Sequence, residues 1–263
     1  MTRRRLDVEL VRRGLVPSRE AAQETITAGL VTVGGSLATS SSAMVAADQA
    51  VVVAGAARRF VSRGGDKLRS ALDRFGIDPR DRDCLDAGAS TGGFTDCLLE
   101  AGASRVITVD VGYGQLAWEL RNDPRVVVLE RTNVRDLAPA GLPFVPSLVV
   151  ADLSFISLRL VLAALGAVAT SDAEFVVLVK PQFEAGPADV GRGGVVRDTA
   201  VWRRTIDEVA VAASAAGIGP LGVMASPLRG PAGNREFLLY GRRGSGGASL
   251  DVDAAIAEAE TDS

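Results

Sequence analysis

The chain has 263 residues, a net charge of −3 and 47% hydrophobic residues, which suits one large soluble domain joined to a small one. It contains no histidine, and this excludes Ser-His and Cys-His catalysis as well as metal sites that use imidazole. Acid–base chemistry must therefore use Lys, Asp, Glu, Tyr or Cys side chains, and we expect no metal site.

From the sequence we expect no signal peptide and no membrane span. No apolar run reaches the roughly 18 residues of a membrane span, and residues 1–7 are not followed by the apolar segment of a signal peptide. We expect a cytoplasmic, monomeric protein without membrane contact, in which Cys84 and Cys97 are reduced, buried thiols.

Charge is distributed unevenly along the chain. Residues 1–69 hold eleven Lys or Arg and six Asp or Glu side chains, a net charge of +5, although the whole chain is acidic. A basic end on an acidic body indicates an anionic partner for the first part of the chain.

The first 60 residues predict a small module of two helices and a hairpin. Apolar positions at 6, 10 and 11 predict a helix over residues 5–14 that ends at Gly14. Ser18 is expected to cap a second helix over residues 19–28. Strands are expected at 30–33 and 50–53, with a Gly34-Gly35 turn after the first.

This module resembles the S4 RNA-binding domain. The resemblance rests on Arg5-Leu-Asp7, on Ser18-Arg-Glu-Ala-Ala22 and on the segment from Ile26 to Gly35. It departs from the family in two places: Gly34-Gly35 replaces the usual Asn-Gly, and Thr39 with the serines at 40–42 replaces a basic loop residue. We expect the domain to cover residues 1–60, with 55–60 as a linker. The alternative is a solvated basic face that only docks onto the body of the protein.

The S4 resemblance implies contact with RNA, and arginines gather on both helices and in the linker. The arginines expected to bind RNA are Arg3, Arg4, Arg5, Arg12, Arg13, Arg19, Arg58 and Arg59.

The most informative stretch runs from Asp83 to Asp96 and reads as a strand, a glycine turn and a helix start. This is the layout of a nucleotide-type cofactor site. Its spacing, D-x-G-x-S-T-G-G-F, differs from G-x-G-x-x-G, which argues against a dinucleotide and favours S-adenosylmethionine. The alternative is a tight turn that binds nothing. The cofactor-binding residues expected here are Asp86, Gly88, Ser90, Gly92, Gly93 and Phe94.

Further cofactor contacts are expected after the next strands. Asp110 ends a strand about 20 residues past the glycine turn, where a carboxylate can accept both hydroxyls of a cofactor ribose. Asn133 and Asp136 follow the third strand, where an adenine ring would lie. Asp110 could instead be an ordinary surface acid at a strand end.

Apolar strands alternate with helices through residues 61–242, which indicates an α/β, doubly wound, mostly parallel seven-stranded sheet of the Rossmann-like kind. Beyond this domain we expect a disordered acidic tail over residues 243–263, with room for a short helix. The expected strands after the glycine turn are 105–110, 126–129, 147–152, 175–180, 221–224 and 236–240, and the expected helices are 67–75, 158–169 and 203–216.

Four ionisable residues fall at strand ends or at a helix start: Lys67, Asp152, Lys180 and Glu236. A lysine at the end of a buried strand is costly unless it is paired, so a structural ion network is one explanation. Methylation of a ribose 2′-hydroxyl is the other, because it needs the oxygen oriented and its proton removed. A desolvated lysine beside another lysine can serve as that base, with the carboxylates holding both amines. Asp152 is also expected to contact the cofactor.

These four residues match the order and strand context of the Lys-Asp-Lys-Glu tetrad of FtsJ-type ribose 2′-O-methyltransferases. Together with the S4-like module and the Asp152-Leu-Ser-Phe155 motif, they make the chain resemble the TlyA, or haemolysin A-type, family. The resemblance implies S-adenosylmethionine-dependent methylation of cytidine 2′-hydroxyls in ribosomal RNA of ribosomal subunits. Some members thereby confer sensitivity to capreomycin-class antibiotics. Nothing in the sequence supports the pore formation that the haemolysin name suggests.

Four other functions are open to test. A non-catalytic RNA-binding or ribosome-assembly factor with a vestigial methyltransferase fold would show a degraded tetrad, and the tetrad is intact. Amino-group methylation of a base usually uses an Asn/Asp-Pro-Pro-aromatic motif where this chain has Asp152-Leu-Ser-Phe155. C5 methylation would need a catalytic cysteine, and a nicotinamide enzyme would need the other glycine spacing.

Overall fold

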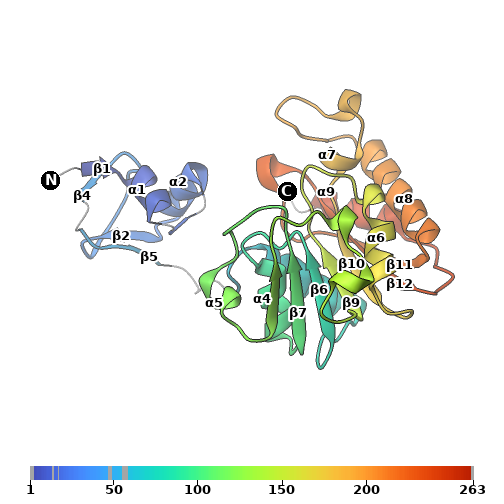
Figure 1. Ribbon diagram of the computed structural model, residues 1–263. Coiled ribbons are helices and arrows are strands. Elements are labelled where there is room, and N and C mark those ends of the chain that lie inside the picture. Colours follow the sequence, from blue (N-terminus) through green and yellow to red (C-terminus); the bar gives the residue numbers. More distant parts are fainter. Residues whose placement is uncertain (1–2, 14, 17, 47–48, 55–58, 262–263) are drawn as a thin grey trace. The chain divides into compact units, whose positions relative to one another are not determined.

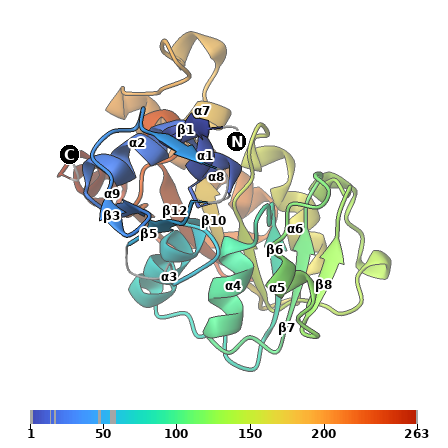
Figure 2. The same ribbon diagram turned by 90° about the vertical axis from the view of Figure 1, so that its left-hand side faces the viewer.

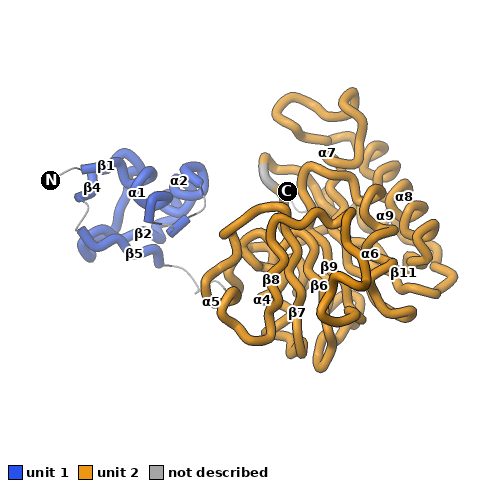
Figure 3. The backbone as a smooth tube through the Cα atoms, in the orientation of Figure 1, with its two compact units in different colours: residues 1–58 blue, residues 59–263 orange. Residues whose placement is uncertain are grey.

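The computed structural model describes residues 3–13, 15–16, 18–46, 49–54 and 59–261. The chain divides into two compact units, residues 1–58 and residues 59–263 (Figure 3). Most of the linker expected at 55–60 lies outside the described residues, and residues 59–60 belong to unit 2.

Unit 1 contains the two helices that the sequence predicts, α1 (Leu6–Arg12) and α2 (Arg19–Thr27). The Ser18 side chain accepts a hydrogen bond of 3.1 Å from the Ala21 backbone N–H, which confirms the expected cap. Gly14, the expected end of the first helix, lies outside the described residues. The helices bury Leu6, Leu10, Ala22 and Ile26 in a small core of their own.

The strands of unit 1 form two antiparallel sheets. The larger has the order β3-β2-β5, with Thr32 opposite Leu37 on one side and Val52 on the other. Gly34 and Gly35 both have positive φ, 59° and 84°, as a tight hairpin turn between β2 and β3 requires. The strands are β1 (Arg3–Arg5), β2 (Val31–Val33), β3 (Ser36–Leu37), β4 (Met44–Ala46) and β5 (Val51–Val53).

Unit 2 is built on a seven-stranded sheet with the order β11-β12-β10-β9-β6-β7-β8 (Figure 1). Strands β8, β7, β6, β9 and β10 are parallel, whereas β12 runs antiparallel to both β10 and β11. This is the mostly parallel Rossmann-like sheet that the sequence predicts. The strands are β6 (Asp83–Ala87), β7 (Arg105–Val109), β8 (Val126–Leu129), β9 (Leu148–Ala151), β10 (Glu174–Val179), β11 (Ile218–Ala225) and β12 (Phe237–Arg243).

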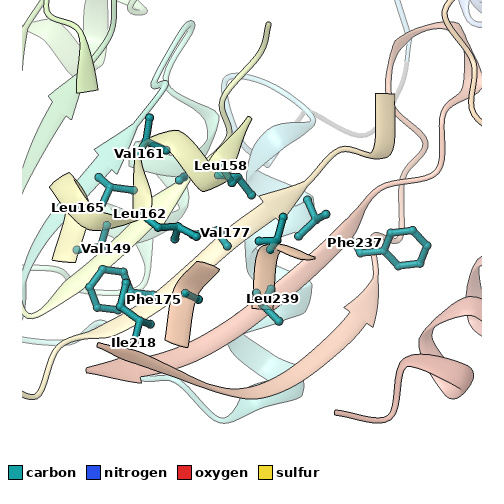
Figure 4. Close-up of a cluster of buried hydrophobic side chains, with 14 of the residues drawn as sticks. Val149, Leu158, Val161, Leu162, Leu165, Phe175, Val177, Ile218, Phe237 and Leu239 are labelled. Carbon is teal, nitrogen blue, oxygen red and sulfur yellow. The ribbon is translucent and has the colours of Figure 1, made fainter. Parts of the chain in front are cut away.

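Helices cover both faces of this sheet because alternate strand residues point to opposite faces. Cys84 and Leu148 pack with α3 and α4 on one face (Figure 2). Leu85 and Val149 pack with α6, α8 and α9 on the other face. Figure 4 shows part of this cluster, with Val149 near Leu162 and Leu165 of α6. The helices of unit 2 are α3 (Gly64–Phe75), α4 (Gly93–Glu100), α5 (Trp118–Arg121), α6 (Leu162–Val168), α7 (Pro181–Glu184), α8 (Thr199–Ala215) and α9 (Val252–Thr261).

Helix boundaries differ from the expected ones by a few residues. Helix α3 begins at Gly64, so Lys67 is its fourth residue. Helix α8 begins at Thr199, because the Asp198 carboxylate caps it by accepting a 2.8 Å hydrogen bond from the Ala200 N–H. None of the helices in the described part of the chain has the length and apolarity to span a membrane.

The expectation of a disordered tail is wrong for residues 252–261. They form α9, which buries Val252, Ala255, Ile256 and Ala259 against the face of the sheet that α8 covers. These positions follow an i, i+3, i+4, i+7 pattern, so one side of the helix is apolar despite the acidic composition. The tail is therefore part of the folded methyltransferase-type unit.

Candidate active site at the carboxyl edge of the sheet

The turn after β6 has a backbone that requires glycine at two positions. Gly88 has φ +85°, and a Cβ there would lie 2.5 Å from the Asp152 carbonyl oxygen. Gly92 has φ +98°, and a Cβ there would lie 2.3 Å from the Leu120 side chain. The turn can thus lie close against the end of β9 and against α5 only with glycine at both positions.

A cleft of about 590 Å³ opens beside this turn. Five of the residues expected to bind the cofactor line it, and the neighbouring side chains of Gln115, Leu153 and Phe155 complete its wall. A larger, more open hollow over α8 and α9 shares none of these residues. The five expected residues in the lining are Gly88, Ser90, Asp110, Asn133 and Asp152.

Asp110 is held firmly at the end of β7. Its two carboxylate oxygens accept hydrogen bonds from the Ser90 N–H, at 2.8 Å, and from the Gly112 N–H, at 2.7 Å. Each oxygen keeps a further lone pair, so the carboxylate can accept additional hydrogen bonds from a ligand in the cleft. Ser90 reaches this position with a positive φ of 48°.

Besides Asp86, four of the expected cofactor residues lie outside the cleft lining. Gly93 starts α4, where a Cβ would lie 2.1 Å from the Ser62 hydroxyl, and Phe94 packs in the core against α3. Gly92 lies on the side of the turn that packs against Leu120 of α5. Asp136 is exposed on a short 3-10 helix, whereas Asn133, which precedes that helix, faces the cleft.

Asp86 lies fully buried behind the turn. Its Oδ2 accepts a 2.7 Å hydrogen bond from the Thr95 hydroxyl, and its Oδ1 has no partner among the residues that the structure describes. Burial raises the pKa of Asp86 to about 7, and the charge of Asp152 adds to this effect. This unpartnered carboxylate oxygen behind the turn can accept a hydrogen bond from a polar or cationic group.

The four tetrad residues form two short ion pairs. Lys67 Nζ lies 2.5 Å from Glu236 Oε2, and Lys180 Nζ lies 2.5 Å from Asp152 Oδ1. Lys180 also donates a 3.1 Å hydrogen bond to the Ser154 hydroxyl. Both lysines are nearly buried, with 8% of Lys67 and 7% of Lys180 exposed. Each pair is therefore partly shielded from solvent, and each fixes one ammonium group in position.

Sheet topology brings the pairs to one edge. Lys180 directly follows β10 and Asp152 directly follows β9, its parallel neighbour. Because β12 is antiparallel to β10, with Phe237 opposite Val179, Glu236 arrives at the same edge. Helix α3 supplies Lys67 from outside the sheet. Glu236 Oε1 has no hydrogen-bond partner among the described residues.

Lysine occurs nowhere else in the chain: Lys67 and Lys180 are its only lysines among 29 Lys and Arg residues. Arginine makes all the other ion pairs of basic side chains found in the described residues. A guanidinium does not lose its proton in proteins, whereas an ammonium can. The two lysines are thus the basic side chains of this edge that are able to lose a proton.

The arginines of unit 1 are organised by two buried acids. Asp7 pairs with Arg5 and Arg19, both at 3.0 Å, and these contacts hold its pKa well below the usual range. Glu9 pairs with Arg12 and Arg13, and mainly the Arg12 hydrogen bond lowers its pKa to about 2.

The remaining expected RNA-binding arginines differ in their surroundings. Arg4 lies 4.0 Å from Glu9, and Arg3 is exposed on β1. Arg59, in unit 2, pairs with Glu100 and lies over the Phe60 ring. Arg58 lies outside the described residues.

Sequence reasoning missed two residues that follow Asp152. Ser154 holds Lys180, and Phe155 is 91% exposed at the cleft with a positive φ of 63°. Their place directly after a strand-terminal acid was the available signal.

Comparisons with known proteins agree with this geometry. The FtsJ-like methyltransferase family matches residues 60–243, and the S4 domain matches residues 4–51. A Mycobacterium tuberculosis protein named 16S/23S rRNA (cytidine-2′-O)-methyltransferase TlyA is 54% identical over 90% of this chain and 89% of its own length. Hemolysin A of Brachyspira hyodysenteriae is 39% identical over 90% of this chain and 98% of its own.

A solved structure agrees as well. A Streptococcus thermophilus protein described as a hemolysin has a TM-score of 0.82 and 36% identity, covering 100% of this chain and 97% of the other. With a family match over most of the chain and an S4 domain before it, the chain belongs to the TlyA, or haemolysin A-type, family of FtsJ-like methyltransferases.

Proposed function

We propose that the protein is an S-adenosylmethionine-dependent methyltransferase that acts on the ribose 2′-hydroxyl of cytidine in ribosomal RNA. The observation that carries the proposal is the pair of nearly buried lysine–carboxylate contacts, Lys67–Glu236 and Lys180–Asp152, at one edge of the sheet, where Asp152 lines the cleft. The name of the Mycobacterium tuberculosis relative supports the same reaction and the same kind of RNA. We further propose that the protein works as a monomer in the cytoplasm.

The residues around the cleft fit the cofactor. Asp110 has lone pairs left for the ribose hydroxyls, Asn133 faces the cleft, and Gly88 allows close approach to the backbone. The unpartnered Oδ1 of Asp86 offers an acceptor behind the turn. When bound, the cofactor supplies a methyl group that is already activated as a sulfonium.

Lys180 is the residue we assign to the acceptor hydroxyl. Asp152 and Ser154 hold its Nζ in one place, where the amine can orient the ribose oxygen. In its neutral form Lys180 would accept the hydroxyl proton, while the ribose oxygen would take the methyl group of the bound cofactor and a neutral thioether would leave. Lys67, held by Glu236, supplies a positive group at the same edge. In-line positioning of the two reactants then provides most of the rate.

We propose that unit 1 is the RNA-binding domain. Asp7 and Glu9 hold the guanidinium groups of Arg5, Arg12, Arg13 and Arg19 in fixed positions, while those side chains stay partly exposed. Fixed guanidinium groups lose little conformational entropy when they bind phosphates.

Methyl transfer to ribosomal subunits tests this function directly. The full chain is incubated with unmethylated ribosomal subunits and cofactor carrying a labelled methyl group. We expect label on RNA, resistant to alkaline cleavage at one or a few cytidines, as 2′-O-methylation requires. Label on a base, or none on RNA, would overturn the proposal.

A further inference from the structure

Residues 186–197 form an arm that joins α7 to α8. Helix α7 itself begins directly after Lys180 at the end of β10. The arm projects from unit 2 beyond α7 (Figure 1) and folds back on itself as a small hairpin (Figure 2). Gly191 and Val195 form its bridge, and Gly193 and Gly194, with φ of 80° and 76°, make its turn.

One buried side chain pins this arm. Asn234 is 3% exposed, and its Oδ1 accepts a 3.0 Å hydrogen bond from the Val196 N–H. Its Nδ2 donates a 2.9 Å hydrogen bond to the Gly194 carbonyl. The Val196 carbonyl in turn accepts a 3.0 Å bond from the Trp202 indole. An amide suits this position because it donates and accepts at once.

The lower part of the arm is anchored separately. Asp189 pairs at 2.6 Å with Arg204 of α8. Just before the arm, the buried Glu184 carboxylate accepts a 2.7 Å hydrogen bond from the Leu158 N–H. The base and the returning strand of the arm are thus fixed, which leaves the tip around Arg192 facing solvent.

Asn234, which holds the arm, also belongs to the loop that supports Glu236. Asn234 lies two residues before Glu236, and its carbonyl accepts a 2.9 Å hydrogen bond from the Gly230 N–H. Gly230 lies so close to the carboxylate that a Cβ on it would be 2.1 Å from Glu236 Oε1. The arm and the Lys67–Glu236 pair therefore share one support.

The exposed charged side chains of the arm are both cationic. Arg192 and Arg197 are exposed, and neither makes an ion pair within the described part of the chain. The acid of the arm, Asp189, is already neutralised by Arg204. Two unpaired guanidinium groups on a fixed support beside an RNA-modifying site match the phosphates of an RNA backbone.

We propose that the arm is a contact surface for RNA phosphates and that Asn234 is the positioning residue that holds it beside the Lys67–Glu236 pair. This inference rests on the proposed function, because the RNA it binds is the substrate of that site. Arg192 and Arg197 touch the RNA, whereas Asn234 acts through the arm.

Kinetics of full-length variants on ribosomal subunits test the proposal. Arg192→Ala should raise KM for the subunits roughly three- to tenfold. It should also reduce the slope of log affinity against log salt concentration by about one, as expected for the loss of one phosphate contact. Asn234→Ala should raise the same KM by a similar factor while KM for S-adenosylmethionine stays unchanged. The double variant should be no worse than Asn234→Ala alone, since a released arm no longer presents Arg192.

Arg80→Ala is the matched control. Arg80 is exposed in the turn before β6, at the opposite edge of the sheet, so the same loss of charge should leave KM unchanged. All assays are run well below the unfolding midpoint of each variant, because a loss of folded protein alone would lower kcat without changing KM.

The outcomes separate the two proposals. If the native chain transfers no methyl group, the proposed function fails, and affinities for subunits measured without turnover still test the arm. If the Arg192→Ala and Asn234→Ala variants both bind subunits as tightly as the native chain, the arm does not contact RNA. Strictly additive effects in the double variant would show that Asn234 does not act through the arm.

Discussion

Lys67 and Glu236 are 169 residues apart in the sequence, yet Lys67 Nζ lies 2.5 Å from Glu236 Oε2. The contact ties the first helix of unit 2 to the start of β12, near the end of the sheet order. Both side chains are nearly buried, so the pair is costly to desolvate and costly to break.

Breaking this pair separates its structural role from its chemical role. Lys67→Met leaves the Glu236 carboxylate buried without a partner, and we expect unfolding to become easier by about 3–5 kcal/mol. Lys67→Met combined with Glu236→Met removes both charges and should recover most of that loss. Denaturant unfolding measures the stability. Methyl transfer should stay low in both proteins; full activity of the double variant would reduce the pair to a structural element.

Lys180→Ala should lower kcat by roughly 10²- to 10⁴-fold, because the group that orients the ribose oxygen and takes its proton is gone. Binding of S-adenosylmethionine, measured by calorimetry, should persist. Lys180→Arg is the variant to compare with Lys180→Ala, since arginine restores a positive charge beside Asp152 but cannot give up a proton. Turnover near the native rate in Lys180→Arg would contradict the assignment of a base.

Asp110→Asn should weaken S-adenosylmethionine binding by about tenfold or more, because one of the two carboxylate oxygens becomes a donor. The matched control is Asp136→Asn, which makes the same change on an exposed carboxylate outside the cleft lining. Its affinity for the cofactor should equal that of the native chain. Equal losses in both variants would extend the binding site to Asp136.

Asp86 makes stability depend on pH. Its pKa is raised by burial to about 7 in the folded chain from 3.8 in the unfolded chain, so the folded state binds more protons between these values. The stabilisation is complete below pH 3.8 and is lost as the pH rises through 7. Glu184, whose pKa burial also raises, acts in the same direction.

The Asp86→Asn variant isolates this contribution. Its unfolding free energy should fall less than that of the native chain between pH 5 and 8, when both are measured in urea without ligand. Asp78→Asn, at a largely exposed site, should follow the native curve. Parallel curves for Asp86→Asn and the native chain would remove Asp86 as the cause.

Helix α9 should contribute strongly to stability. Ile256 is 8% exposed in the core beside α8, and Ile256→Ala should cost about 2–5 kcal/mol. Val211, 70% exposed on α8, provides a control in which Val211→Ala costs little. Thermal unfolding followed by circular dichroism distinguishes them. Equal midpoints for the two variants would mean that α9 is only loosely attached.

Strand-level features of this fold could be predicted from sequence because they depend on local patterns. Apolar runs that end in Asp110, Asp152 and Lys180 identify parallel strands and their carboxyl edge without knowledge of the partners. The carboxylates were expected to hold the lysines, but which carboxylate pairs with which lysine could not be predicted, since it depends on β12 lying antiparallel beside β10. The assigned roles of these residues remain predictions.

Composition misled the prediction at two places. The glycines before Leu250 and the acidic residues after it suggested disorder, although Val252, Ala255, Ile256 and Ala259 already had helical spacing. In unit 1 the arginines stood out, but the acids that hold them did not. Asp7 and Glu9 look like ordinary surface residues of a helix until the fold buries them.

The confinement of lysine to the site has a practical consequence for chemical labelling. Apart from the amino terminus, every primary amine of the protein lies at the carboxyl edge of the sheet. Reductive methylation with ¹³C-formaldehyde would therefore place spectroscopic probes only on Lys67, Lys180 and the amino terminus. Amine-directed cross-linkers, by contrast, would find almost nothing to react with on the outer surface, so the native chain should resist immobilisation through lysine.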